Sequence, residues 1–381
     1  MTPFEHESRT RLVFGPGALS RLGEIARELA FRRTLVVSDA GVVATGHTAR
    51  ACQALESAGI VVATFSDFDQ DPTSAMADAG AAVARAQGID SLLGLGGGSS
   101  MDCAKAIGFL LANGGRMPDY RGYAKAKKPL PPMIAVPTTA GTGSEAQSYA
   151  LVSDDVTHEK LACGDKSAAF RVAILDPELV VSLPRAVTAA TGYDAIAHCV
   201  ETWVTSARTP VSDLHAREAF RLLDASYERV LALPQDLDAR GATLLGAHWA
   251  GAAIEASMLG ATHACANPLS ARYGTTHGVA IALLLPHVVR WNGAVAGARY
   301  AELLAASGRH VADSEAASVL AARLEALAAA GDLPRGLRSI GVAEADLGAL
   351  AAEAAEQWTG GFNPRPFDAN AAQELYRAAY A

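Results

Sequence analysis

The sequence predicts an α/β domain with a mainly parallel sheet, followed by an all-α domain. Two observations support this fold class. Short apolar segments alternate with helical segments in the first half, whereas from about Thr188 long segments rich in Ala, Leu, Glu and Arg follow without strand-like alternation. A chain of 381 residues is long enough for two domains. Because Pro184 interrupts regular structure, we expect one domain over residues 1–185 and a second over residues 186–381.

The first half contains five apolar segments that we expect to be buried strands. They occupy residues 34–37, 60–65, 91–95, 133–136 and 172–175, and the two helices expected between the first three strands occupy about 49–59 and 73–87. Strands that alternate with helices pair in parallel and are covered on both faces. Ligands of such sheets bind at the carboxyl ends of the strands, where the glycine-rich and polar motifs of this chain lie.

The second half is expected to consist of helices. The clearest helical segments lie at about residues 213–231, 239–258, 300–306 and 316–330. Their Ala-rich tracts have the composition of ordinary helices, so they do not indicate low-complexity disorder.

The composition is typical of a soluble globular enzyme, since 50% of the residues are hydrophobic and 19% are charged. A formal net charge of -8 argues against nucleic acid as a partner, because nucleic-acid binding requires a basic surface. We find no apolar run of the length of a membrane span and no secretory signal at the N-terminus. The five cysteines are scattered and odd in number, which indicates reduced thiols. We therefore expect a cytoplasmic enzyme.

A glycine-rich segment after the third strand is suited to binding phosphate. Residues 96–102 (GGGSSMD) follow the strand and begin a helix. Gly97 and Gly98 allow the backbone to approach an anion, and the first amides of the helix, including that of Ser99, point toward it. The segment does not match the GxGxxG fingerprint, and a plain tight turn is the alternative interpretation.

Two further features favour a dinucleotide. Residues 137–145 (PTTAGTGSE) directly follow a strand and carry hydroxyl groups, among them those of Thr138, Thr139 and Thr142, that can bind phosphate and ribose. The alternative is a polar surface loop. Asp39 ends an early strand, where a carboxylate can accept hydrogen bonds from ribose hydroxyls and repels a 2′-phosphate. We therefore expect NAD as the cofactor rather than NADP.

Asp194 and His198 have the spacing of a metal site. They are four residues apart in a helix-favouring segment, which places both side chains on one helical face. His263 and His277, each surrounded by small residues, can complete the shell. One carboxylate and three imidazoles suit Fe(II), Zn(II), Mn(II) or Co(II). A helical Asp-x-x-x-His pair is more often a surface hydrogen bond or a cap, so the spacing alone leaves both interpretations open.

Five motifs taken together resemble the iron-containing, or group III, alcohol dehydrogenases, with the closest similarity to their lactaldehyde reductases and 1,3-propanediol dehydrogenases. The motifs are GGGSSMDCAK (96–105), PTTAGTGSE (137–145), DPEL (176–179), TGYDAIAHCVE (191–201) and ATHACANPLSARYGTTHG (261–278). The resemblance covers nearly the whole chain. It implies a dehydroquinate synthase-like fold, with an NAD(P)-binding α/β domain and a helical metal-binding domain, and commonly a homodimer.

The resemblance also implies roles for individual residues. The four metal ligands would be Asp194, His198, His263 and His277, with Fe(II) as the expected ion and Zn(II) or another divalent ion as the alternative. Asp102 and Lys160 match positions that line the cofactor site. The substrate pocket would be lined by Ser148, Tyr149, Ile254, Met258 and the Phe362 region, although core packing also explains Ile254 and Met258.

Asn267 is the main departure from the family pattern. Members of the family usually carry a histidine at this position, four residues after His263, where it is thought to assist a proton relay. An amide forms hydrogen bonds but does not titrate. Smaller departures lie at Gln147 and at Phe170-Arg171.

We therefore expect a metal-dependent, NAD-linked dehydrogenase of a small alcohol or diol, or a reductase of the matching aldehyde. The metal would polarise the substrate oxygen, and the nicotinamide would exchange the hydride. One alternative is a dehydrogenase of a larger or anionic substrate, such as an oxoacid, a phosphonate aldehyde or a polyol, with Arg171 and Arg272 as anion partners. A second alternative is a weakly active cofactor-binding homologue that lost its proton relay with Asn267.

Overall fold

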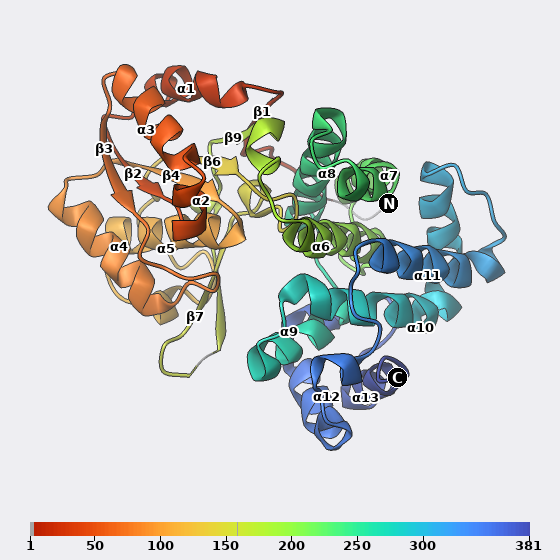
Figure 1. The fold of residues 1–381 in the computed structure, drawn as a ribbon. Helices are drawn as coiled ribbons and strands as arrows, with labels where there is room; N and C mark the ends of the chain where they lie inside the picture. The colour runs from red at the N-terminus through yellow and green to blue at the C-terminus, as the bar shows by residue number, and fades with distance from the viewer. Residues whose placement is uncertain (1–3, 158) are drawn as a thin grey trace. The chain divides into compact units, whose positions relative to one another are not determined.

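A computed structural model describes residues 4–157 and 159–381 and divides into two compact units. The α/β unit comprises Glu7–Thr139 and Gly143–Ser182. The helical unit comprises residues 4–6 together with Ala140–Thr142 and Leu183–Ala381. Figure 1 shows the strands of the first unit in red to yellow-green and the helices of the second in green to blue. The predicted fold class is confirmed.

The α/β unit is built on a six-stranded sheet in which every neighbouring pair is parallel. The strand order is β1 (Arg11–Phe14), β9 (Val172–Leu175), β6 (Met133–Pro137), β4 (Ser91–Gly96), β2 (Arg33–Val37) and β3 (Val61–Phe65). All residues of β4, β6 and β9 are buried, which explains their unbroken apolar runs. The sequence analysis missed β1, because this edge strand is four residues long and half of it is exposed.

Helices cover both faces of this sheet. On one face, α1 (Leu22–Glu28) and α3 (His47–Ser57) pack through Ile25 and Leu55 against alternate strand residues such as Val36 and Ile134. On the other face lie α5 (Gly98–Asn113), where Gly108 lies close to Leu92, and α4 (Ser74–Ala86), which packs on α5. The predicted helices over 49–59 and 73–87 are present with boundaries shifted by about two residues. The short helix α2 (Ala40–Ala44) was not expected.

A second, three-stranded sheet was also missed. It has the order β5 (Gly122–Tyr123), β8 (Lys160–Gly164) and β7 (Tyr149–Ser153), and β7 and β8 are antiparallel. The two longer strands alternate buried with less buried residues, so neither contains the continuous apolar run from which strands were predicted.

The second unit is helical, as expected, and its described residues contain no strand. Its helices are α6 (Arg185–Val204), α7 (Pro210–Ala232), α8 (Leu237–Glu255), α9 (Ala261–Tyr273), α10 (His277–Ala306), α11 (Asp313–Ala330), α12 (Leu347–Glu356) and α13 (Ala369–Ala378). Helix α6 is buried along almost its whole length and packs against α7, α8 and α10. The interior of this unit therefore surrounds the Asp194–His198 segment.

Among the described residues, helix α10 is apolar enough to cross a membrane by length and composition alone. In the structure, 67% of the apolar window is buried inside the protein. This burial is what we expect of a helix in the core of a folded unit.

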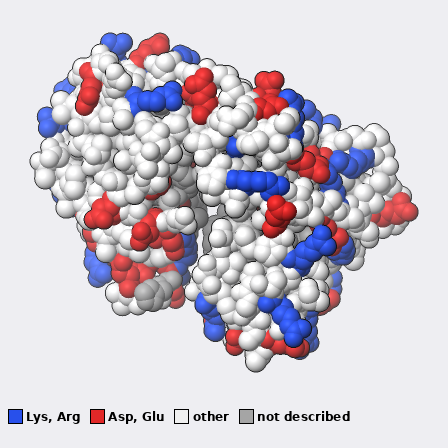
Figure 2. Space-filling model, in the orientation of Figure 1, with Lys and Arg blue, Asp and Glu red and all other residues white. Residues whose placement is uncertain are grey.

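The surface carries charges of both signs. Figure 2 shows Lys and Arg side chains interspersed with Asp and Glu side chains over the face drawn. Some of these charges form ion pairs, such as Arg290 with Glu325 at 2.7 Å. The net charge of -8 is therefore distributed over a mixed surface.

Candidate metal and cofactor sites

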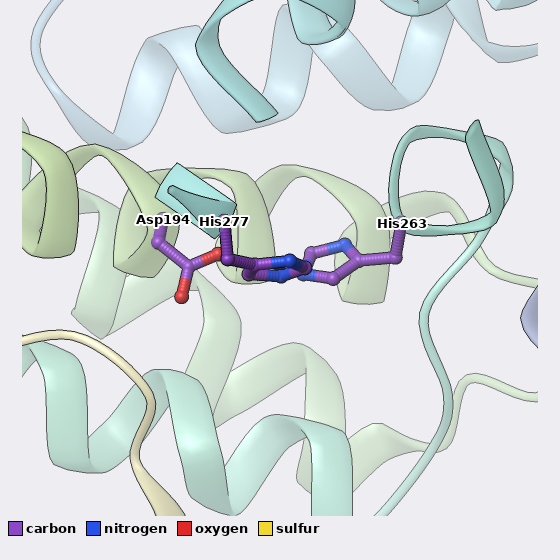
Figure 3. Close-up of side chains that lie close together, drawn as sticks. All are labelled: Asp194, His263 and His277. Carbon is purple, nitrogen blue, oxygen red and sulfur yellow. Dashed lines mark ion pairs between the residues drawn. The ribbon is translucent and has the colours of Figure 1, made fainter. Parts of the chain in front are cut away.

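The four side chains proposed as metal ligands lie close together in the helical unit. Asp194 and His198 are one turn apart on α6, His263 lies in the first turn of α9, and His277 begins α10. Figure 3 shows Asp194, His263 and His277 converging from these different helices. Asp194, His198 and His263 are buried, whereas the His277 side chain is 40% exposed.

The distances between these side chains are those of a ligand shell. Oδ1 of Asp194 lies 3.4 Å from Nε2 of His198, 3.5 Å from Nε2 of His263 and 3.7 Å from Nε2 of His277. The ring centroids of His198 and His263 are 4.9 Å apart. Ligand atoms about 2.1 Å from a shared tetrahedral ion lie roughly 3.4 Å from one another. The ligand atoms of Asp194, His263 and His277 all lie within 4.8 Å of one another, so these three have the dimensions needed to hold one divalent cation, and His198 lies beside Asp194.

Two buried atoms in this cluster lack the partner that burial requires. Among the residues that the structure describes, Oδ1 of Asp194 and Nε2 of His263 have no hydrogen-bond partner. Buried polar atoms without partners destabilise a fold, so most are bonded to protein, water or a ligand. A cation bound between the two atoms would satisfy both. These residues thus fit a metal on grounds independent of their spacing in the sequence.

The electrostatics of the cluster also suit a cation. Burial alone would raise the pKa of Asp194, but the neighbouring His198, His263 and His277 hold it well below its usual range. Burial lowers the pKa of His198 to about 4. For His263 the effect of burial is outweighed by the carboxylates of Glu201 and Asp194, which raise its pKa to about 9. At neutral pH the cluster thus contains an ionised carboxylate and a neutral His198, the forms in which both bind metals, whereas His263 must release a proton when it binds one.

Glu201 ends the motif TGYDAIAHCVE, and no role was predicted for it from the sequence. It lies on α6 three residues after His198 and is buried. One carboxylate oxygen accepts a hydrogen bond from the backbone amide of Thr262 at 2.7 Å, and the other contacts Nδ1 of His263. A carboxylate three residues after a proposed ligand, in a helix with Asp194 as its other carboxylate, is the signal that could have identified it.

Asn267 lies one turn after His263 on the same face of α9. Its amide group donates a hydrogen bond to Oε1 of Gln357 at 3.0 Å. Gln357 was not considered in the sequence analysis. Neither member of this amide pair titrates, so the pair can orient a neighbour but cannot carry a proton.

The proposed phosphate-binding residues lie at the carboxyl ends of three adjacent strands. Gly97, Gly98 and Ser99 begin α5 directly after β4, and Thr138 follows β6 and donates its backbone amide to Gly96. Gly96 has a φ of +148°, and a Cβ there would lie 2.2 Å from Oγ of Ser100. Only glycine fits this turn without displacing its neighbours.

Asp39 and Thr139 lie close to the same turn. Asp39 follows β2 and caps α2 by accepting a hydrogen bond from the backbone amide of Val42 at 3.1 Å, and its second oxygen accepts one from Ser100 at 3.2 Å. A Cβ on Gly97 would lie 3.3 Å from Cγ2 of Thr139. The structure therefore brings these residues together around the start of α5.

A buried lysine connects α5 to the loop that follows β6. Lys105 donates hydrogen bonds to the backbone oxygen and the hydroxyl of Ser144, both at 2.8 Å, and to the backbone oxygen of Tyr149 at 2.7 Å. The Ser144 hydroxyl donates to Asp102 at 2.7 Å. Burial raises the pKa of Asp102, although Lys105 partly opposes this shift. The sequence analysis gave Lys105 no role.

The other predicted residues differ in how they lie relative to this group. Lys160 begins β8, pairs with Asp71 and acts electrostatically on Asp102, whose pKa it lowers, so it does lie near this group. Thr142 is grouped with the helical unit. Arg272, a candidate anion partner, already donates hydrogen bonds to Glu353 at 2.8 and 2.9 Å, while Arg171 is exposed. The residues expected to line the substrate pocket are divided between the two units, Ser148 and Tyr149 in one and Ile254, Met258 and Phe362 in the other.

Comparison with known proteins gives matches along almost the whole chain. A model of the iron-containing alcohol dehydrogenases matches residues 9–177, and one of the C-terminal part of the Fe-containing alcohol dehydrogenase family matches residues 188–380. The chain is 34% identical to the NAD-dependent methanol dehydrogenase of Bacillus methanolicus, over 93% of both chains. It is 34% identical to the 1,3-propanediol dehydrogenase of Klebsiella pneumoniae, over 96% of both.

Two further matches agree with these. The lactaldehyde reductase of Escherichia coli K12 is 32% identical over 96% of this chain and 97% of its own. The crystal structure of a 1,3-propanediol oxidoreductase superimposes with a TM-score of 0.96 at 33% identity, and each chain is covered completely.

Proposed function

Because this chain belongs to the iron-containing alcohol dehydrogenase family, we propose that it is a metal-dependent, NAD-linked alcohol dehydrogenase, or aldehyde reductase, of a small alcohol, diol or aldehyde. The relatives named above act on methanol, 1,3-propanediol and lactaldehyde. The observation that carries the proposal is the buried cluster of Asp194, His198, His263 and His277, with two unpartnered ligand atoms facing each other.

Asp194, His198, His263 and His277 would hold the metal, which we propose to be Fe(II), with Zn(II) or another divalent ion as the alternative. When bound, such an ion supplies a Lewis acid that lowers the pKa of a hydroxyl or polarises a carbonyl. Bound NAD would supply a hydride acceptor for the alcohol carbon, and the hydroxyl would release its proton. The burial of three ligands limits the water around the reacting oxygen, which strengthens every electrostatic interaction there.

The α/β unit would bind the cofactor. The backbone amides of Gly98 and Ser99, which begin α5, would donate to the pyrophosphate, and the glycines would allow its close approach. The hydroxyls of Thr138 and Thr139 add hydrogen-bond donors beside this turn. Asp39 would accept from the adenosine ribose, which favours NAD over NADP. We therefore propose that residues 1–185 bind the cofactor and residues 186–381 the metal.

Asn267 and Gln357 would act by orientation alone, because neither side chain takes up a proton at Nδ2 or Oε1 near neutral pH. The proton released from the hydroxyl would then leave through water or the cofactor ribose. This route is the point at which the enzyme would differ from relatives that carry a histidine. An anionic substrate has less support, because Arg272 is already paired with Glu353.

We further propose a cytoplasmic homodimer. All five cysteines are free thiols, which is typical of a reducing compartment. The edge strand β1 leaves Phe14 46% exposed, and an exposed apolar edge is a common contact between protomers. Light scattering coupled to size exclusion would test the dimer.

The activity is tested by a substrate panel with NADH consumption as the readout. Protein purified without oxygen and loaded with Fe(II) or Zn(II) is assayed with formaldehyde, propanal and lactaldehyde, and in reverse with methanol and propane-1,3-diol. We expect turnover of at least one small neutral substrate, with NADH preferred to NADPH. Turnover of only anionic aldehydes, or of none, would contradict the proposal.

A further inference from the structure

We propose that Glu201 is a positioning residue that fixes the His263 ring with Nε2 directed at the metal, an inference that rests on the proposed metal-dependent function. Glu201 touches neither substrate nor cofactor in this account. It would act through His263 alone, by setting which ring nitrogen carries the hydrogen and which is free to bind a cation.

Both oxygens of the Glu201 carboxylate are engaged by the first turn of α9. Oε1 accepts a hydrogen bond from the backbone amide of Thr262 at 2.7 Å, and Oε2 contacts Nδ1 of His263. The side chains of Glu201 and His263 are each 5% exposed, so water does not compete for these contacts. Because two separate donors hold the carboxylate, it cannot rotate away from the ring.

The chemistry of a carboxylate then determines the tautomer of the ring. An ionised carboxylate only accepts hydrogen bonds, so Nδ1 of His263 must carry the hydrogen. In the neutral ring this leaves the lone pair on Nε2. Nε2 is the atom that lies 3.5 Å from Oδ1 of Asp194 without a hydrogen-bond partner. The Glu201 carboxylate thus contacts one nitrogen of the His263 ring, and the other nitrogen faces the proposed cation site. Such carboxylate–histidine pairs orient the ligand in many metal sites.

A buried frame holds the same turn of α9 from its other side. Oδ1 of Asn363 accepts from the backbone amide of Ala261 at 3.3 Å, and Asn363 and Asn292 exchange hydrogen bonds at 2.9 and 3.1 Å. A Cβ on Gly260 would lie 3.2 Å from Oε1 of Glu201 and 3.1 Å from Oδ1 of Asn363. The backbone therefore enters α9 between two hydrogen-bond acceptors, the side-chain oxygens of Glu201 and Asn363. The partial positive charge at the N-terminus of the helix also stabilises a negative charge on Glu201.

The variant Glu201→Gln separates positioning from packing. A glutamine has the same size, and its oxygen can still accept from the Thr262 amide. Its NH₂ group would then donate to Nδ1 of His263, which moves the ring hydrogen to Nε2, facing Asp194. We expect the variant to fold, but the hydrogen of the His263 ring would lie on Nε2, the nitrogen that would otherwise bind the metal.

The experiment measures metal affinity, not turnover. Full-length wild type and Glu201→Gln are stripped with a chelator, checked by thermal melting without metal, and titrated with Zn(II) and Co(II) in competition with a chromophoric chelator. We expect the affinity of Glu201→Gln to be about 10- to 100-fold lower than that of wild type. Equal affinities within twofold, in a variant that melts as a folded protein, would overturn the inference.

Asp224→Asn is the matched control, since Asp224 is another buried carboxylate of the helical unit. Its partners are Arg323 at 2.7 Å and Arg309, and it contacts none of the four proposed ligands. We expect this variant to melt at a lower temperature and to bind metal as wild type does. A loss of affinity equal to that of Glu201→Gln would show a general effect of removing buried charge, against the inference.

A second measurement covers the case in which Glu201→Gln fails to fold. In zinc-loaded wild type with ¹⁵N-labelled histidines, the shifts of the ring nitrogens report which nitrogen of the neutral, metal-bound ring carries the hydrogen. Hydrogen on Nδ1 of His263 supports the inference, and hydrogen on Nε2 overturns it. A wild type that binds no divalent ion would instead refute the proposed function, so the two failures are distinguishable.

Discussion

Oδ1 of Asp194 lies 3.5 Å from Nε2 of His263, and neither atom has a hydrogen-bond partner among the residues that the structure describes. The two side chains come from different helices, α6 and α9, and both are buried. A carboxylate and an imidazole that face each other in this way are stable when a third group lies between them. With His198 and His277 beside them, that group is best supplied by a divalent cation.

Replacement of a ligand should remove the metal. We expect His263→Ala to lower metal affinity by more than the roughly 10- to 100-fold typical of losing an outer partner. Turnover should fall in parallel, because the substrate oxygen loses its Lewis acid. The measurement is metal content after dialysis, together with NADH oxidation. The exposed His310 provides the control, and a His263→Ala protein that retains metal would contradict the ligand assignment.

The turn before α5 should not tolerate a side chain at Gly96. A Cβ would meet Oγ of Ser100 at 2.2 Å in a backbone conformation that other residues rarely adopt. We expect Gly96→Ala to destabilise the protein by about 1–3 kcal/mol and to raise the KM for NADH. Denaturant unfolding and initial rates measure the two effects.

Gly348→Ala is the matched control for that substitution. Gly348 lies in the exposed part of α12, where the nearest neighbour of a Cβ is the side-chain end of Gln373 at 3.8 Å. Alanine is the better helix former, so stability should stay the same or rise by up to about 1 kcal/mol. Equal behaviour of the two variants would indicate that Gly96 is not required for the turn.

The coenzyme preference should depend on Asp39. Removal of its charge takes away the repulsion of a 2′-phosphate, so we expect the ratio of kcat/KM for NADPH to that for NADH to rise at least tenfold. Asp39→Ser is the appropriate change, because serine can still cap α2 through the Val42 amide. Asp39→Ala also loses the cap, which should lower stability by about 1 kcal/mol. An unchanged ratio in both variants would remove Asp39 from the ribose site.

A histidine at position 267 should introduce a titrating group beside the reaction. We expect Asn267→His to raise kcat and to add an inflection to its pH profile near the ordinary histidine pKa of about 6.5. Gln357 remains available as a hydrogen-bond partner. The comparison is kcat against pH for both proteins. A wild-type rate near zero that rises steeply in Asn267→His would favour a weakly active homologue, and identical profiles would exclude a role for this position.

The strands that the sequence predicts are those whose burial leaves a pattern in consecutive residues. Strands such as β4 and β6 are buried on both faces, so their residues form unbroken apolar runs. Strand β1 and the small sheet were missed, because edge strands and half-exposed strands carry no such run.

The residues of the candidate site also differ in how far the sequence alone predicts them. Asp194 and His198 are linked by helical spacing, which can be read directly from the chain. His263 and His277 lie on other helices. Their small neighbours made them candidates, and the resemblance to a family assigned them to the same ion as the first pair. Glu201 and Gln357 acquire their roles from partners distant in sequence, Thr262 with His263 and Asn267 respectively. Helical and strand periodicities relate only residues that are close in sequence, so they do not predict such contacts.

The metal content of active protein tests the central claim most directly. Protein purified without oxygen is analysed for bound metals, stripped with a chelator, and reloaded stepwise with Fe(II) or Zn(II) while NADH consumption is followed. We expect activity to disappear on stripping and to return in proportion to the metal bound, reaching its maximum at one ion per chain. Full activity in protein free of any divalent ion would contradict the account.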